Sequence, residues 1–153
     1  MPLDRKDLLL LAELQRDGRV ANSALAARVG LSESACLRRV RLLEEQGYIE
    51  RYVAVLNAAK LGIGVGLLVR ITLKSQVDRE LKAFEAAVRA VPEVVECYLT
   101  TGESDYVLRV VARSAEDIER IHSKVLTKLP GVARVESSFV LREVTRGAAL
   151  PLG

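Results

Sequence analysis

The 153-residue sequence has no tryptophan, a single histidine and only two cysteines. Cys36 and Cys97 lie far apart, each inside an apolar periodic segment, so we expect two buried free thiols and a cytoplasmic protein. The histidine, His122, lies on a charged segment beside Glu119 and Lys124, with no second histidine or cysteine at ligand spacing. The sequence therefore predicts no metal site, and no Cys–His or Ser–His–Asp nucleophile set can be assembled around this histidine.

Long apolar runs and a leader segment are also missing. No uninterrupted apolar run approaches about 18 residues, and no charged, apolar and cleavable segment opens the chain. We therefore expect a chain that is neither exported nor held in a membrane. Nucleotide-binding glycine patterns are absent too, because Gly62, Gly64 and Gly66 lie in a linker and a strand start with no helix after them. No catalytic residue and no cofactor are predicted, and an enzyme is disfavoured.

What the sequence does have is apolar content and one local cluster of basic residues. Hydrophobic residues make up 50% of the chain, which is enough for a packed core in one large or two small domains. The net charge of +3 is too small to indicate a nucleic-acid partner by itself. The argument for such a partner therefore rests on the cluster Arg38, Arg39 and Arg41.

This cluster lies in a segment, residues 23–43, that reads as a short helix, a tight turn and a longer basic helix. Gly30 closes the short helix, because glycine takes the left-handed conformation of that turn without strain. Ser32 stands where a helix N-cap belongs, and Glu33 suits the positive end of the helix dipole. The spacing predicts a helix-turn-helix.

The longer helix has an apolar face and a basic face. At 100° per residue, one side carries Cys36, Leu37, Val40 and Leu43. On the other side, arginines could reach phosphates or guanine edges in a major groove, and small residues would let the backbone approach. The alternative is a solvated charged face in a small helical domain, with Arg41 pairing Glu44 or Glu45. The predicted DNA-contacting residues are Ser32, which is mainly a cap, Ser34, Ala35, Arg38, Arg39 and Arg41.

The rest of the first 64 residues completes this domain. Residues 48–56 are β-branched and aromatic, which predicts a strand pair or wing packed on the helices. Residues 1–56 are therefore predicted to form a winged helix-turn-helix domain, and residues 57–64 a linker. The predicted helices are residues 4–17, a helix capped by Asn22 or Ser23, and the basic helix ending at Gln46.

From residue 65 the hydrophobic periodicity changes to a mixture of strands and helices. The order β-α-β-β-α-β is that of a ferredoxin-like fold, whose two helices cover one face of a four-stranded sheet. Residues 65–146 are assigned to this domain, and the fold class of the chain is α+β. The tail, residues 147–153, either packs on a domain or stays loose. The predicted strands are residues 65–73, 94–101, 104–111 and 132–144, and the helices lie near residues 81–91 and 118–129.

The strands of this domain carry apolar residues on both faces. Leu108 and Val107, for example, differ by one position and so point to opposite sides of the sheet. Left exposed, the face without helices would be a large apolar patch. The simplest solution is a second copy of the chain packed sheet against sheet, so we predict a homodimer, with Arg70, Arg109 and Arg142 pairing carboxylates near the rim.

Several separated segments resemble the motifs of the Lrp/AsnC family of transcription regulators, also called feast/famine regulators. The resemblance covers nearly the whole chain. Family members often carry prolines early in the recognition helix, where this chain has Glu33 and Ala35, so no operator sequence is implied. The matching segments are Leu3–Asp7, Leu31–Ile49, Thr101–Val110, Leu129–Val132 and Ser137–Phe139.

The resemblance implies a sequence-specific DNA-binding regulator of transcription that forms dimers, tetramers or octamers and is controlled allosterically by an amino acid bound between protomers. An amino acid needs backbone N–H groups for its carboxylate and an anion for its ammonium, and Gly102 and Asp105 supply both within one loop. The alternative for these two residues is a plain hairpin. By resemblance, Leu99, Thr101 and Phe139 line the pocket for the effector's side chain.

Two other classes of function stay open from the sequence. In one, the C-terminal domain is an amino-acid sensor that acts through a protein partner, and the helical domain is the docking module. In the other, the ferredoxin-like domain is a small-molecule enzyme with its site between sheets. That enzyme would need a titratable partner for Asp105, and the sequence offers none that is clear.

Overall fold

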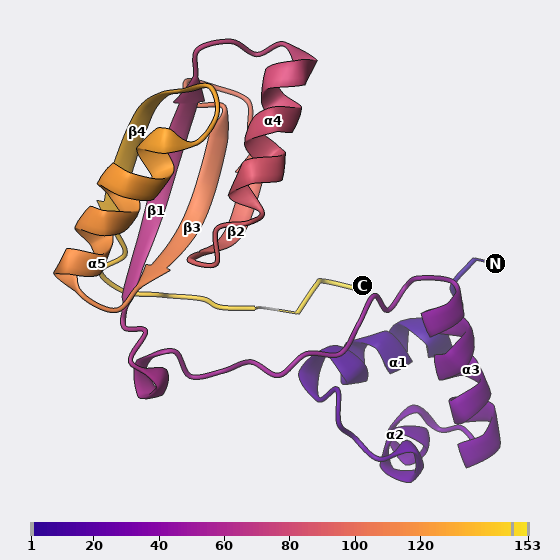
Figure 1. The fold of residues 1–153 in the computed structure, drawn as a ribbon. Coiled ribbons are helices and arrows are strands. Elements are labelled where there is room, and N and C mark those ends of the chain that lie inside the picture. Colours follow the sequence, from indigo (N-terminus) through magenta and orange to yellow (C-terminus); the bar gives the residue numbers. More distant parts are fainter. Residues whose placement is uncertain (1, 148, 153) are drawn as a thin grey trace. The chain divides into compact units, whose positions relative to one another are not determined.

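The computed structural model describes residues 2–147 and 149–152, and the chain folds into two compact units (Figure 1). One unit contains the chain up to Val55 together with the tail from Thr145, and the other is Leu56–Val144. The tail is fastened to the first unit through Gln15, whose side-chain amide exchanges two hydrogen bonds with the backbone of Leu150 (2.7 and 3.3 Å).

The first unit contains the helices α1 (Arg5–Arg16), α2 (Asn22–Val29) and α3 (Glu33–Glu45), close to their predicted limits. Asp4 caps α1 in a reciprocal arrangement, because its carboxylate accepts from the Asp7 N–H and the Asp7 carboxylate accepts from the Asp4 N–H. The predicted cap of α2 is wrong. Ala21 occupies the cap position without a side-chain hydrogen bond, and Asn22 donates instead to the Glu33 carbonyl (2.9 Å).

The core of this unit is formed where the helices cross. Leu10 and Cys36 are fully buried, and Leu25, Ala26, Val29 and Leu43 pack around them. Leu37 was predicted on the buried face of α3 but is 42% exposed. A small helical unit buries a narrow stripe, which here follows the spacing of Cys36, Val40 and Leu43, and Leu37 lies outside it.

The predicted strand pair over residues 48–56 does not form among the described residues. The chain leaves α3 through Gly47 and then runs without a strand to residue 57. Tyr52 anchors this segment by donating to Glu44 (2.9 Å), whereas Val53 and Val55 are 69% and 78% exposed. A strand needs a partner, and this unit supplies none within the described residues.

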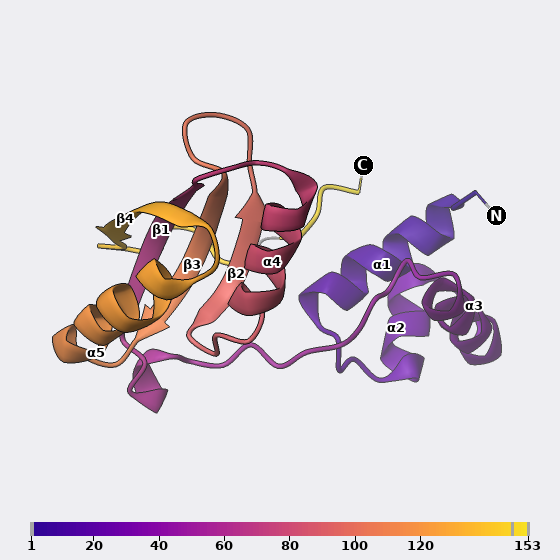
Figure 2. The same cartoon turned by 45° about the horizontal axis from the view of Figure 1, so that its top comes forward.

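The second unit has the predicted β-α-β-β-α-β order. Its four-stranded sheet has the order β2-β3-β1-β4 with antiparallel neighbours, and α4 and α5 lie on the same face of it (Figures 1 and 2). The elements are β1 (Val65–Leu73), α4 (Asp78–Val88), β2 (Val94–Leu99), β3 (Tyr106–Ala112), α5 (Ala115–Arg120), the π-helical turn η2 (Ile121–Val125), the 3-10 turns η1 (Ala59–Leu61) and η3 (Leu126–Lys128), and β4 (Val132–Phe139).

Alternate residues of the central strands fill the core between sheet and helices. Leu67, Val69 and Ile71 of β1 are at most 2% exposed, and Tyr106 of β3 stacks on Phe84 of α4 with ring centroids 4.5 Å apart. The opposite face is open in the protomer and mixed in character. Its side chains include Leu68, which is 46% exposed, Arg70, Val107 and Arg109.

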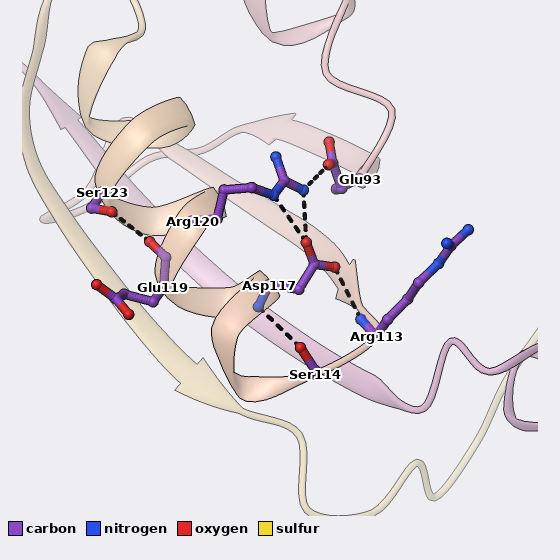
Figure 3. A network of polar contacts seen from close by, with 7 residues as sticks. All are labelled: Glu93, Arg113, Ser114, Asp117, Glu119, Arg120 and Ser123. Atoms are coloured by element: carbon purple, nitrogen blue, oxygen red, sulfur yellow. Dashed lines mark hydrogen bonds and ion pairs between the residues drawn. The ribbon is translucent and has the colours of Figure 1, made fainter.

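The second predicted helix of this unit is broken into α5, η2 and η3. Ser114 caps α5 by accepting from the Asp117 N–H (3.2 Å), and Asp117 in turn accepts from the Arg113 N–H and from Arg120 (Figure 3). These hydrogen bonds, that of Arg120 foremost, lower the pKa of Asp117. Arg120, the last residue of α5, also pairs with Glu93, so the network fixes α5 to the turn before β2 (Figure 3).

The core of the first unit offers a matched test of this packing. Leu10→Ala is expected to destabilise the protein by about 2–5 kcal/mol, because it removes a fully buried side chain and leaves a cavity. Leu9→Ala changes the neighbouring residue, which is 42% exposed, and should cost less than about 0.5 kcal/mol. Urea unfolding of both variants, followed by circular dichroism, measures the difference; equal losses would contradict the assigned core.

Candidate functional site

The turn between α2 and α3 is built as its sequence predicts. Gly30 has a left-handed φ of 65°, and the Ser32 hydroxyl accepts a hydrogen bond from the Ala35 N–H (3.3 Å). Lys6 of α1 adds a contact that sequence reasoning missed, since its ammonium donates to the carbonyls of Val29 and Gly30. A cation at the negative end of α2 stabilises that helix end and fixes the turn against α1.

The outer face of α3 presents most of the predicted DNA-contacting residues. The side chains of Arg38 and Arg41 are exposed, and within the described part of the chain neither forms an ion pair. The pairing of Arg41 with Glu44 or Glu45 is not formed there either. Two guanidinium groups on this face are therefore available to phosphates or base edges. Ser32 and Ser34 are also exposed, and Ala35 is half-buried.

Arg39 differs from its neighbours because its guanidinium is already bound. Nη1 lies 2.7 Å from Asp4 Oδ2 and 2.7 Å from Asp7 Oδ1, the two carboxylates of the α1 cap. The hydrogen bonds to Asp7 and Asp4 raise the pKa of Arg39, and the backbone N–H of Asp7, followed by Arg39, lowers the pKa of Asp4. Arg39 thus fixes α3 to α1 in the protomer.

The loop between β2 and β3 contains three of the predicted effector residues, Thr101, Gly102 and Asp105, and a fourth, Leu99, is the last residue of β2 directly before it. Leu99, Thr101 and Gly102 are exposed, with Gly102 at a φ of 118°, whereas Asp105 is only 7% exposed. The Asp105 carboxylate accepts from the Leu73 N–H (2.7 Å) through Oδ2 and from the Gln76 amide (2.7 Å) through Oδ1.

Asp105 therefore fastens this loop to the end of β1. Its backbone N–H also donates to the Ile71 carbonyl (2.9 Å), and the Thr100 hydroxyl donates to the Ser104 carbonyl (3.1 Å). Both carboxylate oxygens are engaged inside the protomer. The geometry favours a structural role for Asp105, one that holds the exposed part of the loop, Thr101–Gly102, in place.

Phe139 is not brought to this loop. It pairs with Leu67 in β1, whereas Tyr106, next to the loop, pairs with Ile71. Four residues along a strand correspond to about 13 Å, so Phe139 lies toward the opposite end of the sheet in the same protomer. Its side chain is 62% exposed there.

The open face of the sheet carries the remaining charged residues of interest. Of the three predicted arginine pairings, that of Arg109 is observed, with Nε 2.9 Å from Glu96 Oε1. Within the described residues, Arg70 and Arg142 form no ion pair in the protomer. Next to the loop this face is hollowed, and the hollow is lined by Arg70, Thr101 and Arg134 among others. Within the described residues no cluster of histidine, cysteine and carboxylate groups could hold a metal ion. No described helix is long and apolar enough to cross a membrane.

A helix-turn-helix with free arginines and a separate ferredoxin-like unit define a two-part DNA-binding protein, and comparison with known proteins agrees. Residues 3–50 match the family model described as winged helix-turn-helix DNA-binding, and residues 67–150 match the Lrp/AsnC ligand binding domain. The chain belongs to the Lrp/AsnC family of transcription regulators. It is accordingly a DNA-binding transcription regulator with a ligand-binding domain.

Individual relatives match over almost the full chain. The Bkd operon transcriptional regulator of Pseudomonas aeruginosa is 40% identical over 150 residues, covering 98% of each chain. The leucine-responsive regulatory protein of Salmonella typhimurium is 39% identical over 148 residues, 97% of this chain and 90% of that protein. A transcriptional regulator of Neisseria meningitidis, solved with L-methionine, has a TM-score of 0.94 at 35% identity, covering 99% of this chain and 97% of its own.

The Asp105 contacts predict a measurable loss of stability. Asp105→Ala leaves the buried Leu73 N–H without its acceptor, which is expected to cost about 1–3 kcal/mol. Asp105→Asn keeps one carbonyl oxygen as an acceptor and should cost less. Glu103→Ala, in the exposed part of the same loop, is the control and should be neutral. Denaturant unfolding of the three variants checks this order, and a neutral Asp105→Ala would contradict it.

Proposed function

We propose that the protein regulates transcription as a homodimer that binds DNA through the outer face of α3 and responds to an amino acid. One observation carries the DNA-binding part: the Ser32-capped helix holds Arg38 and Arg41 outward, without partners in the described part of the chain. We assign residues 1–56 to DNA binding, 57–64 to a linker and 65–146 to effector binding and dimerisation. A regulator of this kind works in the cytoplasm and needs no catalytic group.

The residues of α3 have different roles in the proposed recognition of DNA. Arg38 and Arg41 reach phosphates or guanine edges, and the small side chains of Ser34 and Ala35 allow close approach to the bases. Arg39 keeps the helix in place against α1 and acts as a positioning residue. In a dimer two such helices enter successive major grooves, so the operator is roughly palindromic, with half-sites about one helical turn or a multiple apart.

The effector is proposed to be an amino acid bound at the β2–β3 loop where protomers meet. The neisserial relative was solved with L-methionine, and the Salmonella relative is named for its response to leucine. Leu99, Thr101 and Gly102 are exposed at this loop, and Asp105 positions it. Phe139 of the same protomer is too far away, so Phe139 can join the pocket only from a second protomer. Larger assemblies, tetramers or octamers, would repeat this contact.

Binding of the effector would shift the spacing of the DNA-binding domains or the oligomer equilibrium. Such coupling is reciprocal, because an effector that changes DNA affinity by some factor must itself bind with an affinity changed by the same factor when DNA is bound. The proposed regulator is allosteric in this sense.

DNA binding is tested with the segment upstream of the protein's own gene, titrated over a series of salt concentrations. Arg38→Ala is expected to weaken binding without lowering stability, and to reduce the salt slope by about 1 if the contact is to phosphate. If Arg38 reads guanine, about 1–3 kcal/mol of discrimination between sequences is lost instead. Arg39→Ala should lower both stability and DNA affinity, because it releases α3 from α1.

Arg19→Ala, which removes an exposed arginine outside α3, is the control and should bind as the unmodified protein does. Equal, weak binding of the unmodified protein and Arg38→Ala to any DNA would overturn the recognition-helix assignment. The result would favour an amino-acid sensor that acts through a protein partner.

The dimer is tested on the open face of the sheet. Leu68→Asp places a charge at the centre of the proposed contact and is expected to shift the protein toward monomer in sedimentation velocity experiments. Leu61→Asp, at a residue that is 56% exposed in η1, introduces the same charge away from the sheet and should leave the dimer intact. A Leu68→Asp protein that sediments as a dimer would show that the copies meet elsewhere.

A further inference from the structure

A cleft lies between α4 and the edge strand β2, within a single protomer. Glu85 of α4 and Arg89, the residue that follows this helix, form one wall, and Val94, Cys97 and Leu99 of β2 form the other. The pairing of β2 with β3 is irregular between Val94 and Glu96, as at a β-bulge. Bulges at sheet edges re-aim side chains and are common beside binding sites. The cleft is distinct from the hollow on the open face of the sheet.

The two charged groups of the cleft are held near each other without a close hydrogen bond. Glu85 Oε2 and Arg89 Nη2 lie 3.8 Å apart, which is within ion-pair range but longer than a hydrogen bond. The other carboxylate oxygen, Oε1, accepts from the hydroxyl of Tyr106 (2.9 Å). Tyr106 is 1% exposed, and burial together with this hydrogen bond raises its pKa. The tyrosine therefore remains a donor that fixes the position of Glu85.

The remaining lining of the cleft is apolar or already committed. Val88 and the ring of Tyr106 are buried at its base, and Val94 is half-buried beside them. Glu96 also reaches the cleft, but its carboxylate binds Arg109 and accepts from Tyr98. The remaining charged groups are thus the carboxylate of Glu85 and the guanidinium of Arg89, which are paired only loosely with each other. Such a pair suits a zwitterion better than a ligand of net charge.

We propose that this cleft is a second binding site, for a free amino acid with an apolar side chain. The ligand's carboxylate binds Arg89, its ammonium binds Glu85, and its side chain lies over Val94 and the ring of Tyr106. The two charged groups of an amino acid are attached to one carbon, so they match opposite charges 3.8 Å apart. The assignment rests on the proposed response to an amino acid, but the site is complete in one protomer and does not use the β2–β3 loop.

The thiol of Cys97 provides a local reporter for occupancy. Cys97 lines the cleft, whereas Cys36 is fully buried in the other unit and should not react in the folded protein. Burial raises the pKa of Cys97, so alkylation by iodoacetamide is followed at mildly alkaline pH, where more thiolate is present. The modified cysteine is identified by mass spectrometry of the full-length protein.

L-leucine and L-methionine are expected to slow alkylation of Cys97 in a saturable manner. N-acetyl-L-leucine, which lacks the ammonium, and L-leucinamide, which lacks the carboxylate, should protect poorly. Glu85→Gln keeps an acceptor for Tyr106 but loses the charge, and Arg89→Gln loses the guanidinium. Each variant is expected to raise the ligand concentration for half protection about tenfold or more. Lys82→Gln, an exposed cation on the same helix that pairs with Asp78, is the control and should change nothing.

Calorimetry with the same ligands distinguishes a failure of the cleft proposal from a failure of the proposed amino-acid response. If leucine or methionine binds but never protects Cys97, the cleft is not the site and the effector at the β2–β3 loop stands. Two binding events per protomer, one of them lost in Glu85→Gln, support the cleft. If none of the twenty amino acids binds, both the cleft and the proposed amino-acid response are overturned.

Discussion

Two helices can cover only one face of a four-stranded sheet. The open face that this leaves, and the proposed dimer contact on it, follow from that constraint. α4 and α5 bury the alternate residues of β1 and β3 that include Val69, Ile71 and Leu108, none of which is accessible to solvent. The other face keeps Leu68 and Val107 in reach of water together with the Arg109–Glu96 pair. A face of this mixed kind is suited to a second protein surface, because its apolar residues gain from burial and Arg109 is already paired with Glu96. In the proposed dimer this face of the sheet is the contact, and the loops at the sheet's ends would lie between protomers.

The DNA-binding unit depends on a different interaction, the one between Arg39 and the α1 cap. A unit with so small a core cannot fix every helix by apolar packing, and the guanidinium of Arg39 adds a directional contact to two carboxylates. Because the folded-state pKa of Asp4 is lowered, its contribution to stability is fully present above the ordinary value of 3.8. The contribution is lost as the pH falls through the lowered pKa. Near neutral pH the orientation of α3 is thus insensitive to pH, while Arg38 and Arg41 remain free for DNA.

Features set by neighbouring residues could be predicted from the sequence, and features set by distant partners could not. The turn at Gly30 and Ser32 is local chemistry, and both ends of β1 follow from its alternation alone. The predicted strand pair over residues 48–56 does not form because a strand needs a partner, and β4 stops near Phe139 for a similar reason. The Val140 N–H donates to the Gly66 carbonyl, and β1 begins at Val65, so only one residue of β1 remains beyond this hydrogen bond.

The roles of the site residues also depend on partners that are distant in the sequence. The sequence predicts a DNA contact for both Arg38 and Arg39, which point about 100° apart on the helix. Only Arg39 meets carboxylates, and these come from residues at the start of α1, more than 30 positions away in the sequence. The sequence allows a ligand role or a structural role for Asp105, and only the fold shows that the Leu73 N–H and the Gln76 amide donate to its carboxylate. Glu85 gave no sequence signal at all, since an isolated carboxylate on a helix is usually solvated. Its importance comes from the buried hydroxyl that holds it.

The two proposed effector sites are connected through β2. Leu99 is the last residue of that strand, lines the α4–β2 cleft and directly precedes the β2–β3 loop. The far end of the loop is fastened by Asp105, whereas Leu99 is 58% exposed and the outer edge of β2 has no strand beside it. A ligand packed against Leu99 would restrict the near end of a loop whose far end is already fixed. The cost of ordering that loop would then be lower for a second ligand, which gives positive coupling between the sites without a change of fold.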